Sequence, residues 1–189
     1  MSLNYLSLFS GIGGLPFDLG LDRAGMTCVA QVEIDPYCRS LLAAHWPEVP
    51  RHDDARTAPE WWLGRGGTTV DLVAGGPPCQ PFSLAGLHGG MADERWGWPW
   101  MLDVIRATRP RYVLVENVPG LLTNSSGIPF GRILADLAAL GFDAEWDVLR
   151  ASDFGAPHPR ERLFLVAHTA GVDVGTRDLL GQGGERTTP

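Results

Sequence analysis

Residues 4–14 read NYLSLFSGIGG, a short apolar run that ends in a cluster of glycines. The apolar run predicts a strand. Residues 15–24 behind the glycines have the pattern of a helix, with Pro16 near its first position, where proline is tolerated. Glycines at a strand-to-helix turn permit positive φ and let a ligand approach the backbone closely. The stretch therefore predicts a ligand-binding turn between a buried strand and a helix.

Strand-like and helix-like segments alternate along the rest of the chain. Further strands are predicted over residues 27–33, 49–52, 71–74, 111–116, 142–150 and 162–168, and further helices over residues 35–45, 59–63, 100–108 and 130–140. Such alternation is typical of the α/β class, with a mostly parallel sheet and helices on both faces. Ligands in these folds bind at the carboxyl ends of the strands. We expect one domain over residues 1–168, and a flexible tail over residues 169–189.

Composition limits the kind of protein. A chain of 189 residues is long enough for one domain with a sizeable core. The formal net charge of −7 argues against a large nucleic-acid surface of its own. Three cysteines without a CxxC pair predict no disulfide framework and indicate a reducing compartment. Without a signal-peptide pattern or an apolar run of about 20 residues, we expect a cytoplasmic protein with no membrane association.

An acidic residue follows the glycine cluster at an informative distance. Glu33 comes 20 residues after Gly13, at the tip of the next predicted strand, where dinucleotide folds place a carboxylate on ribose hydroxyls. The pair predicts a cofactor that contains adenosine, although the spacing is not GxGxxG, and a tight turn with a surface glutamate fits the pattern equally. His52, Asp53 and Asp54 suggest a metal only weakly, because no other ligands occur at fixed spacing. We therefore predict no metal.

A cysteine and a glutamate are the candidates for catalysis. Cys79 lies in residues 73–83, VAGGPPCQPFS, on a proline-rich turn that we expect to expose its sulfur. A thiolate is the nucleophilic form, and positive charge or a helix N-terminus lowers the thiol pKa. Glu116 ends an apolar strand, where burial raises a carboxyl pKa and favours proton donation. Arg160 and Arg162 fit either an anion or carbonyl site or ordinary surface charge.

Six motifs together resemble the DNA (cytosine-5) methyltransferase family. They are FSGIGG, Glu33, Asp54, GGPPCQPFS, ENVPG and HPRERLFLVA, in that order over residues 3–168. The resemblance implies a Rossmann-like S-adenosylmethionine-dependent methyltransferase fold. It also implies methyl transfer to C5 of a cytosine flipped out of double-stranded DNA, through a covalent Cys79 adduct. In this family's mechanism Glu116 holds N3 of the base, Arg162 contacts the base oxygen or nearby backbone, and Arg160 braces the site.

The resemblance also assigns the cofactor pocket. Asp54 corresponds to the acid that contacts the adenine amino group, and Asn117 and Pro78 shape the surrounding loops. The full set of cofactor-binding candidates is Phe9, Ser10, Gly11, Gly13, Gly14, Glu33, Ile34, Asp54, Pro78 and Asn117. Trp98 is a candidate wall of this pocket, but the alternating Trp96, Trp98 and Trp100 fit a plain core equally well.

Two departures from the family pattern leave alternatives open. His158 stands where the family usually has glutamine, and the sequence stops soon after the arginine motif. The target-recognition segment and the last two motifs are therefore expected to be missing. Three interpretations follow: a catalytic half that works with a second polypeptide, a truncated inactive remnant, or a module that binds cofactor or protein without catalysis. A nicotinamide oxidoreductase would leave the PPCQP and ENVPG motifs unexplained.

Overall fold

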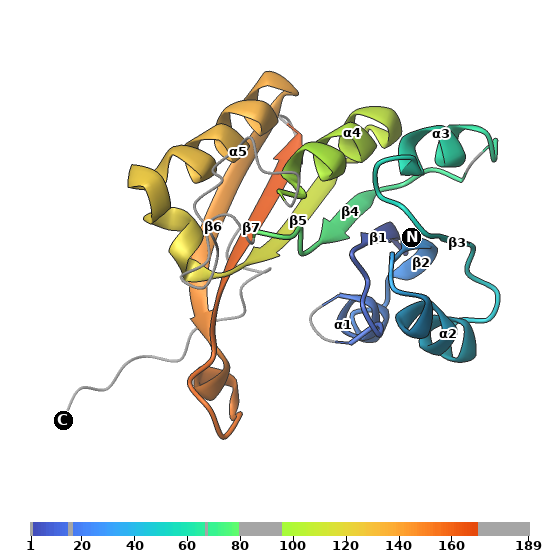
Figure 1. Ribbon diagram of the computed structural model, residues 1–189, viewed down its shortest axis with the longest axis horizontal. Coiled ribbons are helices and arrows are strands. Elements are labelled where there is room, and N and C mark those ends of the chain that lie inside the picture. Colours follow the sequence, from blue (N-terminus) through green and yellow to red (C-terminus); the bar gives the residue numbers. More distant parts are fainter. Residues whose placement is uncertain (1, 15–16, 67, 80–95, 170–189) are drawn as a thin grey trace.

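The computed structural model describes residues 2–14, 17–66, 68–79 and 96–169 (Figure 1). Its strands are β1 (Asn4–Leu8), β2 (Thr27–Val32), β3 (Arg51–His52), β4 (Leu72–Gly75), β5 (Tyr112–Asn117), β6 (Phe142–Arg150) and β7 (Glu161–Thr169). The α-helices are α1 (Asp18–Arg23), α2 (Pro36–His45), α3 (Ala58–Leu63), α4 (Trp98–Thr108) and α5 (Ile128–Ala139). The short 3₁₀ segments in the described part of the chain are η3 (Pro119–Leu122), η4 (Asn124–Gly127) and η5 (Ala151–Phe154).

The strands form one seven-stranded sheet in the order β3-β2-β1-β4-β5-β7-β6. The first five strands in the chain are parallel, whereas β7 runs antiparallel to both β5 and β6. The predicted α/β fold with a mostly parallel sheet is confirmed. Strands β6 and β7 form a long hairpin with η5 at its turn, and this arm projects from the sheet in Figure 1.

Helices cover both faces of the sheet, as predicted. Figure 1 shows α3, α4 and α5 along one side and α1 and α2 on the opposite side. Alternate residues of β1 face the two layers: Leu6 and Leu8 belong to the larger core beneath α3, α4 and α5, while Tyr5 packs with Phe17 and Leu21. No helix among the described residues is long and apolar enough to cross a membrane.

Local sequence signals set several helix ends. The Asp35 side chain accepts a hydrogen bond of 2.9 Å from the backbone N–H of Cys38, and Pro36 is the first residue of α2. This is the expected N-cap followed by proline. Helix α5 ends before Gly141, whose φ of +83° suits glycine, as its predicted place just past the helix requires.

The other predicted elements are present with shifted ends. Helix α1 begins at Asp18, with residues 15–16 outside the described part, and β3 has only two residues. The 3₁₀ segments have no counterpart in the prediction, because stretches this short have no repeating pattern of apolar residues. Strand β7 includes Thr169, and the rest of the predicted tail, residues 170–189, lies outside the described residues.

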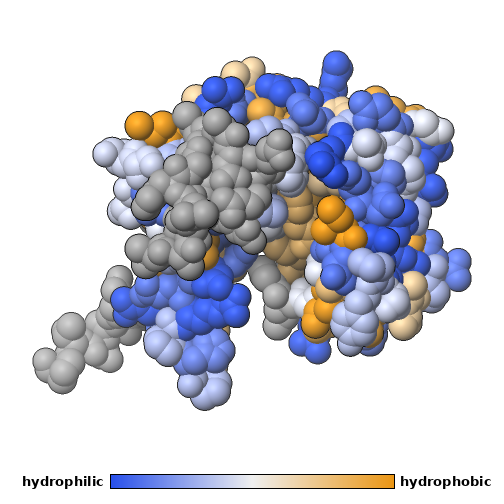
Figure 2. All heavy atoms as spheres, viewed as in Figure 1, coloured by the Kyte–Doolittle hydropathy of each residue, from blue (hydrophilic) through white to orange (hydrophobic). Residues whose placement is uncertain are grey.

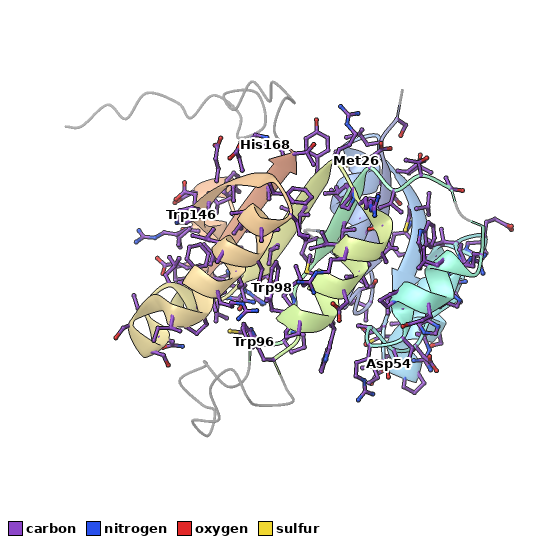
Figure 3. The ribbon with its side chains drawn as sticks, turned by 90° about the horizontal axis from the view of Figure 1, so that it is seen from above. Met26, Asp54, Trp96, Trp98, Trp146 and His168 are labelled. Carbon is purple, nitrogen blue, oxygen red and sulfur yellow. The ribbon has the colours of Figure 1, made fainter. Side chains whose placement is uncertain are left out.

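Trp98 belongs to the larger core, one of the two roles that its sequence pattern fits. Only 1% of its surface is exposed, and its indole Nε1–H donates a 3.0 Å hydrogen bond to Asp136 of α5. In Figure 3 it lies between α4 and α5. The same carboxylate accepts from the Arg132 guanidinium, so the first residue of α4 is tied to the exposed surface of α5.

We predict that Trp98→Phe lowers the free energy of unfolding by about 1–3 kcal/mol, because it removes buried volume and the hydrogen bond to Asp136. Urea denaturation monitored by circular dichroism would measure the change. Trp146→Phe is the matched control, since 48% of that side chain is exposed, and it should change stability by less than about 0.5 kcal/mol. Equal losses in the two variants would contradict the core assignment.

Candidate active site

The site is built at one edge of the sheet by the ends of four parallel strands and the start of one antiparallel strand. Strands β1, β2, β4 and β5 are parallel, so their carboxyl ends share an edge, and the order of strands reverses between β1 and β4. Ligands bind at such a switch point. Because β7 is antiparallel to β5, Phe164 pairs with Glu116 and Leu163 with Asn117. The arginines before and within the start of β7 therefore reach the same edge.

A cavity of about 260 Å³ lies at this edge. It is lined by Pro77, Cys79, Glu116, Asn117, Val118, Arg160 and Arg162. Its volume lies just below the range of about 300–1,000 Å³ typical of pockets for drug-sized ligands. The structure brings the four predicted catalytic side chains to one cavity.

Glu116 is the half-buried acid of the cavity, and an arginine is paired with it. The Arg162 Nε lies 2.8 Å from Glu116 Oε1, and another guanidinium N–H of Arg162 donates to the carbonyl of Glu161 at 2.7 Å. Burial raises the pKa of Glu116, while the charges of Arg162 and Arg160 oppose that rise. The net direction agrees with the expectation for a carboxyl at the end of an apolar strand.

The sulfur of Cys79 differs from the expectation. Cys79 is half-buried, and burial raises the pKa of its thiol to about 11. The expectation of an exposed sulfur is met only in part, because Cys79 lines the cavity but is half-buried, and its raised thiol pKa favours the protonated form at neutral pH. Cys79 also pairs with Trp96 in an isolated antiparallel bridge, and Trp96 is only 8% exposed. Cys79 also packs against the larger core, which accounts for its partial burial.

Contacts between loops fix the turn that carries Cys79, residues 76–79 and called the cysteine turn below, relative to Glu116. The Asn117 side chain donates a 3.1 Å hydrogen bond to the carbonyl of Pro77 and accepts one of 2.9 Å from the Val118 N–H. A Cβ on Gly76 would lie 3.0 Å from Glu116 Oε2, so glycine leaves room for the carboxylate. Asn117 thus braces two loops. The sequence analysis missed the role of Gly76, although a Gly-Gly pair before Pro-Pro was its signal.

Phe9 and Pro78, two predicted cofactor residues, converge on a glycine that the sequence analysis also missed. A Cβ on Gly97 would lie 2.5 Å from Pro78 Cδ and 3.4 Å from the tip of the Phe9 ring. The Gly97 N–H donates a 2.9 Å hydrogen bond to the carbonyl of Pro78. At Gly97 the cysteine turn, the glycine loop and the start of α4 therefore meet. Only glycine fits at this position, because a side chain would collide with Pro78.

The glycine loop, residues 9–14, is held by Glu33. The loop has positive φ at Phe9 (55°), Gly11 (55°) and Gly13 (77°). Glu33 Oε2 accepts a 2.7 Å hydrogen bond from the Gly11 N–H, and Oε1 accepts one of 2.8 Å from the Asp35 N–H. The predicted closeness of the loop and the acid is present in the structure, and the two carboxylate oxygens join the ends of β1 and β2.

The surroundings of this loop fit S-adenosylmethionine chemically. The Glu33 oxygens keep further lone pairs for ribose hydroxyls, and Ile34, 69% exposed, offers an apolar surface to a purine ring. Asp54 is already engaged, because Arg56 Nε lies 2.9 and 3.0 Å from its two oxygens and the Arg56 NH2 lies 2.6 Å from Oδ2. An adenine amino group that bound Asp54 would have to share the carboxylate oxygens with the Arg56 guanidinium or displace it. Among the described residues, no group of three or more potential ligands could hold a metal ion.

The comparisons with known proteins agree on one family. The model of the family described as "C-5 cytosine-specific DNA methylase" matches residues 3–179. The chain is 36% identical over 180 residues to type II methyltransferase M1.HphI of Haemophilus parahaemolyticus, covering 92% of this chain and 48% of that protein. It is 35% identical over 185 residues to M.AquIA of Picosynechococcus, covering 90% of this chain and 74% of that protein.

Solved structures give the same picture of the fold. A protein assigned as a DNA modification methyltransferase, from a prophage of E. coli, matches with a TM-score of 0.72 at 28% identity, over 89% of this chain and 47% of the other. Spodoptera frugiperda DNMT2 matches with a TM-score of 0.71 at 24% identity, over 91% of this chain and 51% of the other. The chain spans about half the length of the first curated relatives that it matches, 48% and 42%.

Replacing either of two adjacent glycines of the loop by alanine should affect stability very differently. A Cβ on Gly13 would lie 2.7 Å from Trp46 Cη2 and 2.9 Å from Leu42 Cδ2, at a φ of +77°. The Trp46 indole donates to Asp22 at 2.5 Å and resists displacement. We predict that Gly13→Ala lowers the free energy of unfolding by about 2–4 kcal/mol, from overpacking and left-handed strain.

Gly14→Ala is the matched control, because its Cβ would meet nothing within 4 Å and its φ is not positive. Its free energy of unfolding should stay within about 0.5 kcal/mol of wild type. Chemical denaturation of both variants gives the comparison. A Gly13→Ala protein as stable as Gly14→Ala would show that the loop is not seated on Trp46.

The protonated thiol predicts slow alkylation in the free protein. Because burial raises the pKa of Cys79 to about 11, its thiolate fraction, and with it the rate of reaction with iodoacetamide, should keep rising with pH beyond pH 9. Peptide mapping by mass spectrometry separates Cys79 from Cys28 and Cys38. A rate for Cys79 that levels off below pH 8 would contradict the buried, neutral thiol.

Proposed function

The chain belongs to the C-5 cytosine-specific DNA methylase family, and on this basis we propose that it transfers a methyl group from S-adenosylmethionine to C5 of a cytosine in DNA. The observation that carries the proposal is the shared cavity of Cys79 and Glu116, with Arg162 paired to the glutamate. A nucleophile and a proton donor on one small cavity are what covalent catalysis on a flat ring requires. The target base would be flipped out of the duplex to reach it.

Addition to the ring is the first step that these residues would perform. As the Cys79 sulfur forms a bond to C6, the thiol proton passes to solvent and the C5–C6 π electrons move toward C5. Glu116 in its protonated form donates to N3, which removes the negative charge that the ring would otherwise carry. Since burial raises the pKa of Glu116, the carboxyl holds its proton at a higher pH than an exposed glutamate does.

The same residues would also complete the cycle. S-adenosylmethionine, when bound, supplies the methyl group that C5 receives. After transfer, C5 loses its proton to a base, the C6–S bond breaks, and Cys79 leaves as a thiolate that takes up a proton from solvent. Glu116 recovers its proton from N3. Arg162, already held by the Glu161 carbonyl, stays beside Glu116 and stabilises the carboxylate formed in the first step.

The proposed cofactor site is the glycine loop with Glu33 and Ile34. Glu33 would accept hydrogen bonds from the ribose, and Ile34 would pack against the adenine. Open space beside Gly11 and Gly14, where a Cβ would meet no atom within 4 Å, would hold the rest of the cofactor. The Asp54 carboxylate would accept a hydrogen bond from the adenine amino group while its oxygens also accept from Arg56.

Double-stranded DNA is the proposed substrate, with part of its recognition supplied by a second polypeptide. A net charge of −7 supports this division, because phosphate binding depends on Lys and Arg, and an acidic chain attracts DNA weakly. The β6–β7 arm, hydrophilic at its end in Figure 2, carries Arg160 beside the cavity and would be the part of this chain closest to the DNA backbone.

A mechanism-based trap tests the nucleophile. DNA containing 5-fluorocytosine should form a covalent adduct with Cys79 in the presence of S-adenosylmethionine, because fluorine at C5 prevents the final elimination. The adduct is seen as a shifted band on a denaturing gel, with and without the proposed second polypeptide. Cys79→Ala should abolish it, whereas the control Cys38→Ala should not. An adduct with Cys79→Ala, or none with wild type under either condition, would overturn the proposal.

Replacing Glu116 tests its proposed role as the proton donor to N3 of the base. Glu116→Gln keeps the shape of the side chain but cannot donate a proton from a carboxyl, and we predict that the rate of tritiated methyl transfer falls by about 10²–10⁴. Glu145→Gln, on the exposed surface of β6, is the matched control and should retain the wild-type rate. A rate for Glu116→Gln within about twofold of wild type would remove the assigned role.

A further inference from the structure

A chain of buried polar side chains runs beneath the glycine loop, on the face of the sheet opposite the larger core. The Ser10 hydroxyl donates to the Ser7 hydroxyl at 2.9 Å, and Ser7 donates to Asp18 Oδ2 at 2.9 Å. The other carboxylate oxygen, Oδ1, accepts from Gln31 Nε2 at 2.8 Å. Ser7, Asp18 and Gln31 are 0% exposed, so none of them can touch a ligand.

The far end of this chain is fixed. The Gln31 amide oxygen accepts a 3.3 Å hydrogen bond from Arg51, which sets the amide orientation so that its NH₂ faces Asp18. Arg51 in turn donates to the carbonyl of Trp46 at 2.7 Å. A buried carboxylate is costly unless donors satisfy it. Here the donors are Ser7 of β1 and Gln31 of β2. Asp18, the first residue of α1, therefore ties this helix to both strands.

The near end is the anchor of the loop. Ser10 is 7% exposed, and its three polar groups all have partners. Its N–H donates to the carbonyl of Val32 at 3.2 Å, and its carbonyl accepts from the Gly13 N–H at 2.9 Å. Its hydroxyl is the group that joins the buried chain. The position of Ser10 therefore determines where Gly11 and Gly13 present their backbone.

We propose that Ser7, Asp18 and Gln31 form a positioning relay that acts through Ser10, fixes the backbone of the glycine loop and thereby sets the affinity of the site for its cofactor. The inference rests on the proposed function only in taking S-adenosylmethionine as the ligand of this loop. The relay touches neither cofactor nor substrate. It restricts the loop before binding, so that the ligand does not have to order it. Its removal should affect binding more than the chemical step.

A double-mutant cycle tests the relay. Ser7→Ala and Ser10→Ala each break the hydrogen bond between the two hydroxyls, so each should weaken S-adenosylmethionine binding by about three- to tenfold in isothermal titration. The double variant should bind S-adenosylmethionine within about 1.5-fold of the weaker-binding single variant, because both substitutions remove the same link. Losses that multiply fully in the double variant would show two independent effects and overturn the relay.

Backbone hydrogen exchange gives a second readout that needs no cofactor. In the same variants the amides of Gly11 and Gly13 should exchange about three- to tenfold faster, while amides of β7 exchange at the wild-type rate. Ser40→Ala is the matched control, since it removes one exposed serine hydrogen bond of 2.7 Å outside the relay. Unchanged exchange in the loop, or equal acceleration in β7, would overturn the proposal.

Two further variants keep the test decisive. If Ser7→Ala does not fold, Ser10→Ala alone still breaks the link while the Ser7–Asp18 bond remains. Asp18→Asn places an amide against the fixed NH₂ of Gln31 or the Ser7 hydroxyl, and it should accelerate exchange in the loop as Ser10→Ala does. If wild type binds no S-adenosylmethionine, the proposed cofactor fails, but the exchange rates still decide whether the relay holds the loop.

Discussion

The site depends on the reversal of one strand. Strands β1 to β5 are all parallel, and a further parallel strand beside β5 would start at the edge away from the site. Strand β7 instead runs antiparallel to β5, and its register places Leu163 opposite Asn117 and Phe164 opposite Glu116. The hairpin with β6 makes this reversal possible, since antiparallel neighbours need only a short connection. As a result Arg162 reaches the carboxyl group at the end of β5, and the acid has a cation beside it.

A second constraint is the close approach of backbones at the switch between β1 and β4. A Cβ on Gly75 would lie 2.9 Å from the carbonyl oxygen of Leu8, and the space beside Gly76 is filled by the Glu116 carboxylate. The glycine loop leaves β1 and the cysteine turn leaves β4, so both loops begin side by side. Small residues at this junction therefore let the glycine loop and the turn that carries Cys79 share one edge of the sheet.

The sequence was sufficient for the features that depend on local patterns. Apolar runs and turn residues predicted the strands and their order along the chain, and the strand ends predicted where Glu33, Cys79 and Glu116 lie. The pairing of Arg162 with Glu116 could not be predicted, because it depends on the direction of β7, which no local pattern encodes. The burial of Cys79 and Trp98 likewise depends on neighbours distant in sequence, Trp96 for the turn and Asp136 on α5 for the indole. Arg56 on Asp54 was overlooked although it lies only two residues away.

Two opposing effects act on the Glu116 carboxyl group of the cavity in the free protein. Arg162 stabilises ionised Glu116 through a 2.8 Å contact, while burial favours the protonated acid, so the two effects oppose each other. Burial also keeps Cys79 as a neutral thiol. In this state the carboxyl is partly committed to the arginine and the sulfur is a weak nucleophile. A ring that offers N3 to Glu116 and excludes water would shift the carboxyl toward its protonated form, since desolvation penalises the charge. Activation of the acid and of the ring would then occur together, and only when the base is in place.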